Sequence, residues 1–209
     1  MAAKISEASP IVFVVDDDDA IREALRSLFR SVGLQVETFN SAAEFLQSEL
    51  PAAPGCLVLD VRLPGLSGLD FQAALAKAGI HIPIIFLTGH ADVPMSVKAI
   101  KAGAVEFLTK PFREQDMLDA IRIALEKDGG RREEDKRRSG LRNRFDSLTA
   151  REKEVIGFVT AGLMNKQIAH ELSITEVTVK MHRSSAMRKL GTKTAAGLTR
   201  IAQVLDMPE

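Results

Sequence analysis

The sequence predicts an α/β fold: a five-stranded parallel, doubly wound (βα)5 domain followed by a small all-α domain. Five short apolar runs alternate with five amphipathic stretches in the first 128 residues, and only helical periodicity returns after residue 148. The charge is also divided, with 12 Lys and Arg against 18 Asp and Glu up to Asp128, and 16 against 10 from Gly129 onward. We therefore expect two modules, an acidic one suited to a cation and a basic one suited to phosphates.

The predicted strands are short apolar runs, often β-branched and bounded by Gly, Pro or polar residues. They cover residues 11–15, 36–39, 56–59, 84–87 and 105–108. The predicted helices between them have apolar residues at helical spacing and cover residues 21–32, 42–49, 69–78, 94–102 and 114–127. Ser41 and Glu44 match a capping box, and Pro94 suits a first helical turn. Five such units predict a parallel sheet that is covered on both faces.

A charged segment, DGGRREEDKRRSGLRNRF, follows the last of these helices. Pairs at i,i+4 such as Glu133 with Arg137 support an exposed helix, while Gly129 and Gly130 each cost about 1 kcal/mol in one. We therefore expect a partly helical linker that can break. The expected organisation is an N-terminal tail (1–9), the α/β domain (10–128), the linker (129–146) and the C-terminal helical domain (147–209).

The C-terminal module contains two predicted helices joined by a very short turn. Thr149 and Glu152 form a second capping box at the start of the module. Further along, helices at residues 165–172 and 176–190 flank a turn at residues 173–175, and Gly191 ends the second helix. Two helices so joined make a helix-turn-helix, whose second helix can lie in the major groove of DNA.

Composition limits the class of protein. Hydrophobic residues make up 45% of the chain, which suits a soluble globular protein. No apolar stretch approaches the ~20 residues of a membrane span, and the first ten residues lack the pattern of a signal peptide. We therefore expect a cytoplasmic protein without membrane association. The single cysteine, Cys56, cannot form an internal disulfide and is expected to be a core residue.

Polar side chains follow four of the predicted strands. Asp16 and Asp17 follow the first strand, and the third, fourth and fifth strands lead to Asp60, Thr88 and Lys110. In open α/β sheets, ligands bind outside the carboxyl ends of the strands. Carboxylates at close range repel one another unless a cation lies between them, and Mg²⁺, with Mn²⁺ as an alternative, prefers such oxygen ligands. The set is therefore suited to forming an aspartyl phosphate whose oxygens bind a lysine and a hydroxyl.

These motifs resemble the receiver domain of two-component response regulators. DD, D-x-R-x-P-G-x-S-G, T and K-P-F occur in that order across residues 10–128. The resemblance implies that Asp60 is the phosphoacceptor and that Thr88 and Lys110 contact the phosphoryl group. It also implies a metal site, whose ligands would be Asp16, Asp17, Asp60 and the backbone carbonyl of Arg62.

The resemblance also implies roles for side chains around the phosphoacceptor. Thr88 and Phe107 match a switch in which an inward movement of the hydroxyl lets the aromatic ring rotate. Arg62 and His90 match the positions that tune the access of water to the acyl phosphate. The next two aspartates, Asp18 and Asp19, are interpreted differently, as a helix N-cap and a first-turn charge.

A phosphohydrolase with an aspartate nucleophile is the competing enzyme interpretation. Enzymes that resemble the haloacid dehalogenase family have a second acidic residue two positions after the nucleophile, and here that position is Arg62. We therefore expect a regulator and not an enzyme. Its only catalysis would be its own phosphotransfer, from a phosphohistidine or a small phosphodonor, and its autodephosphorylation.

The predicted second helix of the helix-turn-helix has two different faces. A helical wheel places Val179, Ala186, Met187 and Leu190 toward the core. The opposite face carries Val177, Met181, Ser184, Ser185 and Arg188, flanked by Thr178 and Lys180. No acidic residue occurs from Val177 to Gly191. This composition favours contacts with phosphates and base edges over a solvated surface.

The second module resembles the LuxR/NarL-type effector domain through T-x-R-E-x-E-V, G-x-x-N-K-x-I-A, T-V-K-x-H and M-x-K-L-G. This resemblance implies that Lys180, Met181 and Ser184 read bases. It places three further side chains nearer the DNA backbone: Lys166, Thr178 and Arg183. The wheel puts Arg183 toward the core side, so a structural role for it stays open.

Over residues 10–205 the chain resembles FixJ-type transcriptional regulators. The expected partners are a sensor histidine kinase, double-stranded promoter DNA and RNA polymerase. We also hypothesise that after phosphorylation the receiver surface forms a homodimer interface or stops masking the DNA-binding module, and a dimer predicts pseudo-palindromic half-sites. A regulator switched by protein partners without phosphate stays open as a second function. The intact set of Asp17, Asp60, Thr88 and Lys110 favours the phosphorylated switch.

Overall fold

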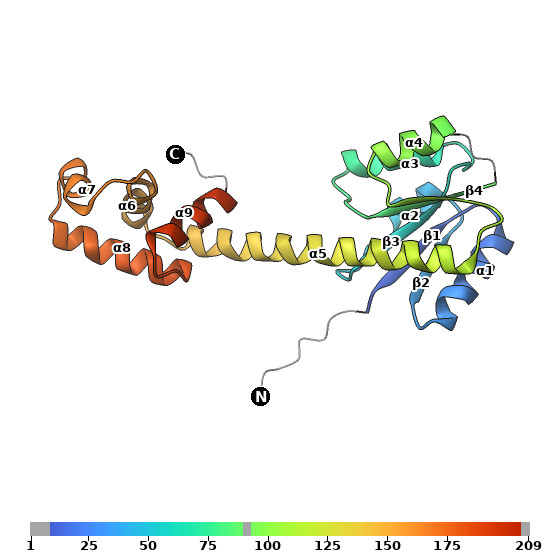
Figure 1. Cartoon of the computed structure of the whole chain (residues 1–209), viewed down its shortest axis with the longest axis horizontal. Helices are drawn as coiled ribbons and strands as arrows, with labels where there is room; N and C mark the ends of the chain where they lie inside the picture. Colours follow the sequence, from blue (N-terminus) through green and yellow to red (C-terminus); the bar gives the residue numbers. More distant parts are fainter. Residues whose placement is uncertain (1–8, 90–92, 206–209) are drawn as a thin grey trace. The chain divides into compact units, whose positions relative to one another are not determined.

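The computed structural model describes residues 9–89 and 93–205 of the chain (Figure 1). The chain divides into two compact units, residues 1–132 and 133–209, and each unit has its own hydrophobic core. Within the described residues, no helix is both long enough and apolar enough to cross a membrane.

The first unit is built on a five-stranded parallel sheet with the strand order β2-β1-β3-β4-β5. Its strands are β1 (Ile11–Val15), β2 (Gln35–Phe39), β3 (Gly55–Asp60), β4 (Ile84–Thr88) and β5 (Glu106–Thr109). Each strand begins and ends within one residue of its predicted bounds. Cys56 is buried on β3, where it packs in the core as expected.

Helices cover both faces of this sheet (Figure 1). They are α1 (Asp19–Ser31), α2 (Ala42–Gln47), α3 (Gly68–Lys77), α4 (Val93–Lys101) and α5 (Glu114–Asp146). Because successive strand residues point to opposite faces, Phe13 belongs to the core cluster that includes residues of α2, α3 and α4. Val12 and Val14 belong to the cluster that includes residues of α1 and α5. The predicted doubly wound α/β fold is confirmed.

Helix α5 continues to Asp146, through the residues for which the sequence predicts a partly helical linker. The two glycines that follow Asp128 do not end it. The carboxylate of Asp128 is buried, and it accepts hydrogen bonds from Arg131 Nη2 at 2.6 Å and from Arg132 Nε at 2.5 Å. It also accepts one from the backbone N–H of Gly55 at 3.0 Å. These contacts tie the helix to the first residue of β3 and span the glycine pair.

The second unit contains the predicted helix-turn-helix. Its helices are α6 (Ala150–Thr160), α7 (Asn165–Glu171), α8 (Glu176–Leu190) and α9 (Ala195–Val204). The turn between α7 and α8 is tight because Ser173 takes a left-handed conformation with φ 52°. The Thr175 hydroxyl then caps α8 by accepting from the N–H of Thr178, and Gly191, with φ 74°, ends that helix.

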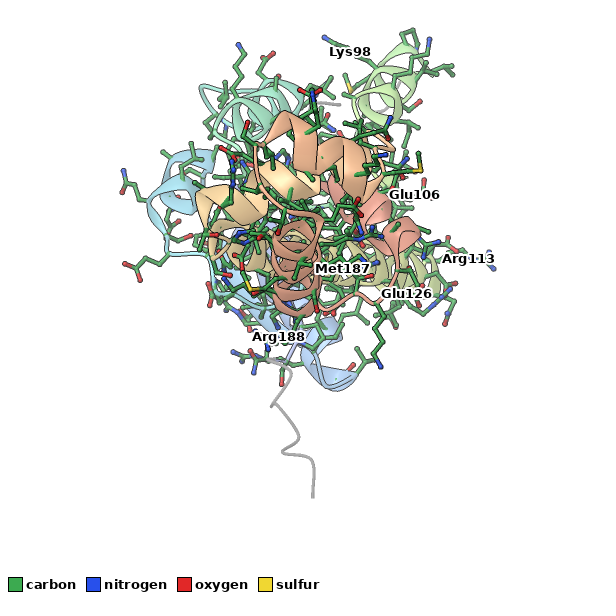
Figure 2. The ribbon with its side chains drawn as sticks, turned by 90° about the vertical axis from the view of Figure 1, so that its left-hand side faces the viewer. Lys98, Glu106, Arg113, Glu126, Met187 and Arg188 are labelled. Carbon is green, nitrogen blue, oxygen red and sulfur yellow. The ribbon has the colours of Figure 1, made fainter. Side chains whose placement is uncertain are left out.

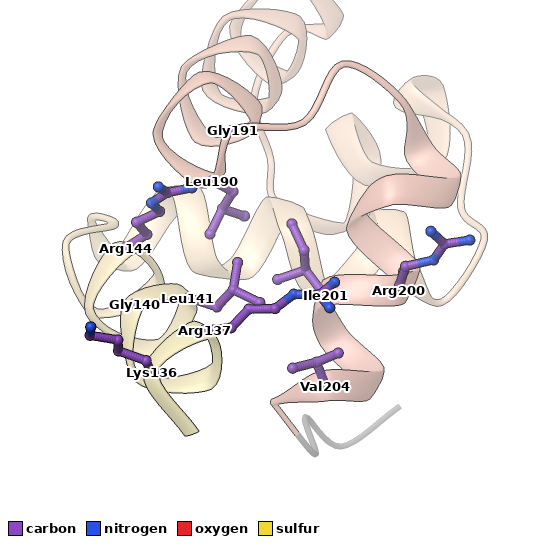
Figure 3. A pocket seen from close by; sticks show the side chains of 10 residues that line it. All are labelled: Lys136, Arg137, Gly140, Leu141, Arg144, Leu190, Gly191, Arg200, Ile201 and Val204. Atoms are coloured by element: carbon purple, nitrogen blue, oxygen red, sulfur yellow. The ribbon is translucent and has the colours of Figure 1, made fainter. Parts of the chain in front are cut away.

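The last part of α5 packs within the second unit. A cavity of about 370 Å³ lies between residues 136–144 of α5 and the helices α8 and α9 (Figure 3). Its apolar lining comes from both sides: Leu141, Leu190, Ile201 and Val204. Phe145 packs on the same core. The C-terminal part of α5 therefore contributes to the folding of the second unit.

Candidate functional site

Three acidic side chains of the first unit converge at the carboxyl ends of neighbouring strands. Asp16 and Asp17 follow β1, and Asp60 is the last residue of β3. One carboxylate oxygen from each of the three residues lies within 4.8 Å of the others. Asp16 is 1% exposed and Asp60 is 8% exposed, whereas Asp17 is open to solvent. Two buried carboxylates so close together require compensating positive charge.

Lys110 supplies part of that charge from the loop after β5. Its Nζ lies 2.6 Å from a carboxylate oxygen of Asp16 and 3.3 Å from one of Asp60. Its backbone N–H donates to the carbonyl of Thr88 at 2.7 Å, which holds the loop against the end of β4. The fold therefore brings Asp16 and Asp60, which are 94 and 50 positions away in the sequence, to the ammonium group of Lys110.

The pKa values of both Asp16 and Lys110 are raised, for different reasons. Burial raises the pKa of Asp16, and repulsion from Asp60 adds to the rise, although hydrogen bonding to Lys110 opposes it. Burial lowers the pKa of Lys110, but the hydrogen bond and charge of Asp16, together with Asp60, outweigh burial and leave that pKa raised. The cluster brings three carboxylates together with the ammonium group of Lys110. A hard divalent cation with oxygen ligands fits this excess of carboxylates.

The turn after β3 is packed tightly against the Asp60 backbone. The N–H of Arg62 donates to the Asp60 carboxylate at 3.2 Å, and the N–H of Gly68 donates to the carbonyl of Val61 at 2.8 Å. A Cβ atom at Gly68 would lie only 2.4 Å from the carbonyl oxygen of Asp60. Glycine is therefore required at the start of α3, a constraint that the motif contained but that the sequence reasoning did not identify.

The two predicted switch residues, Thr88 and Phe107, lie at the end of β4 and on β5. Thr88 is fully buried as the last residue of β4. Phe107 on β5 is only partly buried, and its ring packs on Phe86 with a centroid distance of 6.0 Å and a tilt of 40°. His90, predicted to tune dephosphorylation, lies outside the described residues. The structure thus places the hydroxyl and the ring on adjacent strands.

The remaining aspartates of the DDDD run begin α1. Asp18 is the N-cap, and its side chain accepts from the N–H of Ala20 at 2.8 Å and from that of Ile21 at 3.4 Å. Asp19 lies in the first turn, where its charge complements the helix dipole. The interpretation of these two residues as helix-starting groups is confirmed.

In the second unit, α8 presents the predicted outer face to solvent. Val177 is 76% exposed and Met181 is 61% exposed, while Val179, Ala186 and Leu190 are buried in the core. Lys180, Ser184 and Arg188 are also exposed. Arg188 projects from the outer side of the helix (Figure 2). The division of the wheel is therefore as predicted except at Ser185, which was placed on the outer face. Ser185 is partly buried and hydrogen-bonds to the buried Glu152, so it belongs to the side that packs on α6.

The other predicted DNA contacts surround this face. Lys166 is exposed on α7, and Thr178 is partly buried beside the Thr175 cap. Arg183 is partly buried and donates to Asn165 Oδ1 at 3.2 Å, so it joins α8 to α7. A groove of about 630 Å³ runs along α8, lined by Asn165, Lys180, Arg183, Ser184, Met187, Arg188, Gly191, Thr192 and Lys193. Four of its nine lining residues are cationic, as a phosphate-binding surface requires.

One buried ion pair of the second unit was not predicted. Glu152, expected only as part of a capping box, accepts a hydrogen bond from Lys189 Nζ at 2.7 Å in addition to the N–H of Thr149 at 2.8 Å. Hydrogen bonds from Lys189, Thr149 and Ser185 lower the pKa of Glu152 from 4.5 to about 2. The pair fixes the start of α6 to the last turn of α8 and so orients the helix with the open face.

Two family models match the chain. The model described as "Response regulator receiver domain" matches residues 12–122, and the model described as "Bacterial regulatory proteins, luxR family" matches residues 146–202. The first contains all of the carboxylate and lysine cluster, and the second contains α8 with its open face.

Known proteins resemble the chain along nearly all of its length. Nodulation protein W of Bradyrhizobium diazoefficiens is 54% identical over 197 residues, which are 94% of this chain and 87% of that protein. The transcriptional regulatory protein FixJ of Azorhizobium caulinodans is 41% identical over 91% of this chain and 90% of its own length. The solved structure of response regulator StyR is 50% identical, has a TM-score of 0.84, and covers 94% of this chain and 99% of its own.

Proposed function

The chain belongs to the two-component response regulators that join a receiver domain to a LuxR-type DNA-binding domain, and on this premise we propose that phosphorylation of Asp60 controls its binding to DNA. The arrangement around Asp60 carries the proposal. Its carboxylate ends a buried strand, lies 3.3 Å from Lys110 Nζ and is within reach of two further carboxylates. At such a site, the positive charge of Lys110 is already in place to balance the negative charge of an incoming phosphoryl group.

The phosphoryl group comes from a phosphohistidine of a sensor histidine kinase or from a small phosphodonor. A carboxylate oxygen of Asp60 attacks the phosphorus, the new P–O bond forms as the P–N bond breaks, and the released imidazole nitrogen takes up a proton. Lys110 and Thr88 hydrogen-bond to the phosphoryl oxygens. In autodephosphorylation, water attacks the same phosphorus, the P–O bond to Asp60 breaks, and inorganic phosphate leaves with the protons of the water while the Asp60 carboxylate is restored. Arg62 and His90 tune the access of that water.

A divalent cation completes this site. Asp16, Asp17, Asp60 and the carbonyl of Arg62 would hold Mg²⁺, or Mn²⁺, because three carboxylates at this range fit a hard cation with oxygen ligands. When bound, the ion supplies positive charge to the phosphoryl oxygens.

Phosphorylation changes the receiver surface through Thr88 and Phe107. Thr88 moves toward the phosphoryl group, and the partly buried Phe107 ring turns into the space that it leaves. The altered surface around α4 and β5 then forms a homodimer. Exposed apolar side chains on α4, Val93, Val97 and Ile100, support this surface as the dimer contact.

The DNA-binding domain acts through α8 in the major groove. Lys180, Met181 and Ser184 read bases, while Lys166, Thr178, Arg183 and Arg188 contact the backbone or the groove edge. The functional domains are residues 10–128 and 147–209, joined through residues 129–146. The dimer binds pseudo-palindromic promoter DNA in the cytoplasm and acts on RNA polymerase.

Intact mass after incubation with acetyl phosphate and Mg²⁺ tests the proposal. Wild type should gain one phosphoryl group, about 80 Da for the group transferred to the carboxylate. Asp60→Asn should gain nothing, and the matched control Asp119→Asn, which changes a half-exposed carboxylate on α5, should behave as wild type. Chelation of Mg²⁺ with EDTA should prevent the adduct.

An unmodified wild type would contradict the proposal and would support a receiver that is switched by protein partners without phosphate. An adduct on Asp60→Asn would mean that another residue is the phosphoacceptor.

A further inference from the structure

The open face of α8 carries two apolar side chains that the core does not explain. Val177, Lys180, Met181 and Ser184 follow one another at positions i, i+3, i+4 and i+7, so they form one stripe along the helix. Val177 is 76% exposed and Met181 is 61% exposed. Exposed large apolar side chains at one helical turn from each other, on a face that is otherwise polar or basic, mark a contact surface.

Capping hydrogen bonds order the first turn of α8, in which Val177 lies. The Thr175 hydroxyl accepts from the N–H of Thr178 at 3.1 Å, and the hydroxyls of Thr175 and Thr178 are 2.8 Å apart. Valine is β-branched, so its χ1 angle is restricted in a helix. Met181, one turn later, is a flexible side chain that adapts to the surface it meets. The stripe therefore combines a rigid apolar group near the helix N-terminus with an adaptable one.

Neither side chain can read the hydrogen-bond pattern of a base, and neither can bind a phosphate. The apolar group that a base edge offers in the major groove is the C5-methyl group of thymine. The N-terminal residues of a recognition helix are those that reach base edges. Side chains at i and i+4 are about 5–6 Å apart, and successive bases of one strand rise by about 3.4 Å. Two side chains so spaced reach bases about two steps apart.

We propose that Val177 and Met181 form a paired reader of thymine methyl groups, so that each half-site contains two thymines about two base-pair steps apart. Lys180 lies between them in the stripe and contacts the intervening base edges. Val177 is thereby a specificity-determining residue outside the base-reading positions assigned above. This inference rests on the proposed function, because it requires α8 to enter the major groove.

Replacement of thymine by uracil tests the inference on the full chain. Duplexes that bind the phosphorylated protein are first selected from a random library, and each thymine of the selected half-site is then replaced singly by uracil. This change removes one methyl group and leaves the hydrogen-bonding groups in place. We expect affinity to fall roughly fourfold at two thymines per half-site, the effect of one buried methyl-sized group.

Variants identify which side chain reads each methyl group. Val177→Ala should abolish the effect of uracil at one of the two positions, and Met181→Ala should abolish it at the other. The matched control Val32→Ala, a half-exposed valine after α1, should keep both effects. Because Val177 and Met181 are exposed, unfolding temperatures of all variants should match wild type, which separates loss of contact from loss of fold.

Two outcomes would overturn the inference while leaving the proposed function standing. In the first, duplexes bind but tolerate uracil at every thymine. In the second, uracil weakens binding equally in wild type and in both alanine variants, which would assign the methyl contacts to other residues. Failure of the phosphorylated protein to select any duplex would instead contradict the proposed function itself.

Discussion

Glu152 and Lys189 show how a single buried pair orients α8. Glu152 is 4% exposed, caps α6 through Thr149 and accepts from Lys189 in the last turn of α8. A lowered carboxyl pKa stabilises the fold above the unfolded value near 4.5, and this stability is lost as the pH falls toward the folded value of about 2. The ionised form of Glu152 is therefore part of the folded state at neutral pH.

Glu152→Gln should lower the free energy of unfolding of the second unit by about 1–3 kcal/mol at pH 7, because it leaves the partly buried Lys189 without its charged partner. The difference between variant and wild type should shrink between pH 4.5 and pH 2, as Glu152 becomes protonated in wild type. Denaturant unfolding of both proteins at several pH values measures this difference in the free energy of unfolding.

Glu154→Gln is the matched control. Glu154 is half exposed and pairs with Arg151 at 2.7 Å on the surface of α6, so its loss should change stability by less than about 1 kcal/mol. An equal effect of the two substitutions would show that burial and the second helix add nothing to the Glu152 pair.

Single residues were predicted well where the fold itself brings them together. Parallel strands place their carboxyl ends at one edge of the sheet. Asp60 ends such a strand, and Asp16 and Lys110 follow two others, so the order of strands and polar residues along the sequence is enough to predict that these side chains lie close together. The Glu152 pair does not follow from order, because the contact depends on how α6 and α8 pack. The capping-box pattern predicted the contact between Glu152 and Thr149, but no pattern in the sequence predicted the contact between Glu152 and Lys189.

At the scale of elements, the strands and the first four helices followed from hydrophobic periodicity and capping residues. The exception is α5, for which Gly129 and Gly130 indicated a place where the helix can break. Asp128 accounts for the difference: its buried carboxylate binds two arginines beyond the glycines and the N–H of Gly55. Gly55 is 73 residues away in sequence, so no local pattern reveals this contact.

Asp128→Asn should loosen α5 at the glycine pair. Burial alone would raise the pKa of Asp128, but hydrogen bonds from Arg131, Arg132 and Gly55 outweigh it and lower the pKa. The ionised carboxylate therefore stabilises the fold above its unfolded pKa near 3.8, and this contribution is lost as the pH falls through the lower folded value. We expect amide hydrogen exchange of residues 129–133 to accelerate roughly tenfold at pH 7.

Asp119→Asn provides the control for that measurement, since its half-exposed carboxylate lies on the same helix at 4.0 Å from Arg122. It should leave exchange at residues 129–133 unchanged. Unchanged exchange in Asp128→Asn as well would mean that helix propensity, and not the Asp128 contacts, holds the helix through the glycines.

For the whole molecule, the division of charge along the chain corresponds to two units with different chemistry. The acidic unit contains the carboxylate cluster, and the basic unit contains the open face of α8. To shift a two-state equilibrium from 1:99 to 99:1, phosphorylation must favour one state by about 5.5 kcal/mol. In the proposed function, the association of a second receiver through the surface around α4 and β5 would add to the contacts of the phosphoryl group at Asp60.

The most direct test of the account is the affinity of wild type and Asp60→Asn for one selected duplex at one fixed salt concentration, each with and without acetyl phosphate and Mg²⁺. Fixed salt matters because phosphate contacts make affinity depend steeply on ionic strength. We predict that the phosphodonor tightens binding by wild type at least about tenfold, as expected for allosteric coupling of 1–3 kcal/mol, and leaves Asp60→Asn unchanged. Equal affinities of wild type in both conditions, on protein whose mass shows the phosphoryl group, would contradict the claim that Asp60 controls DNA binding.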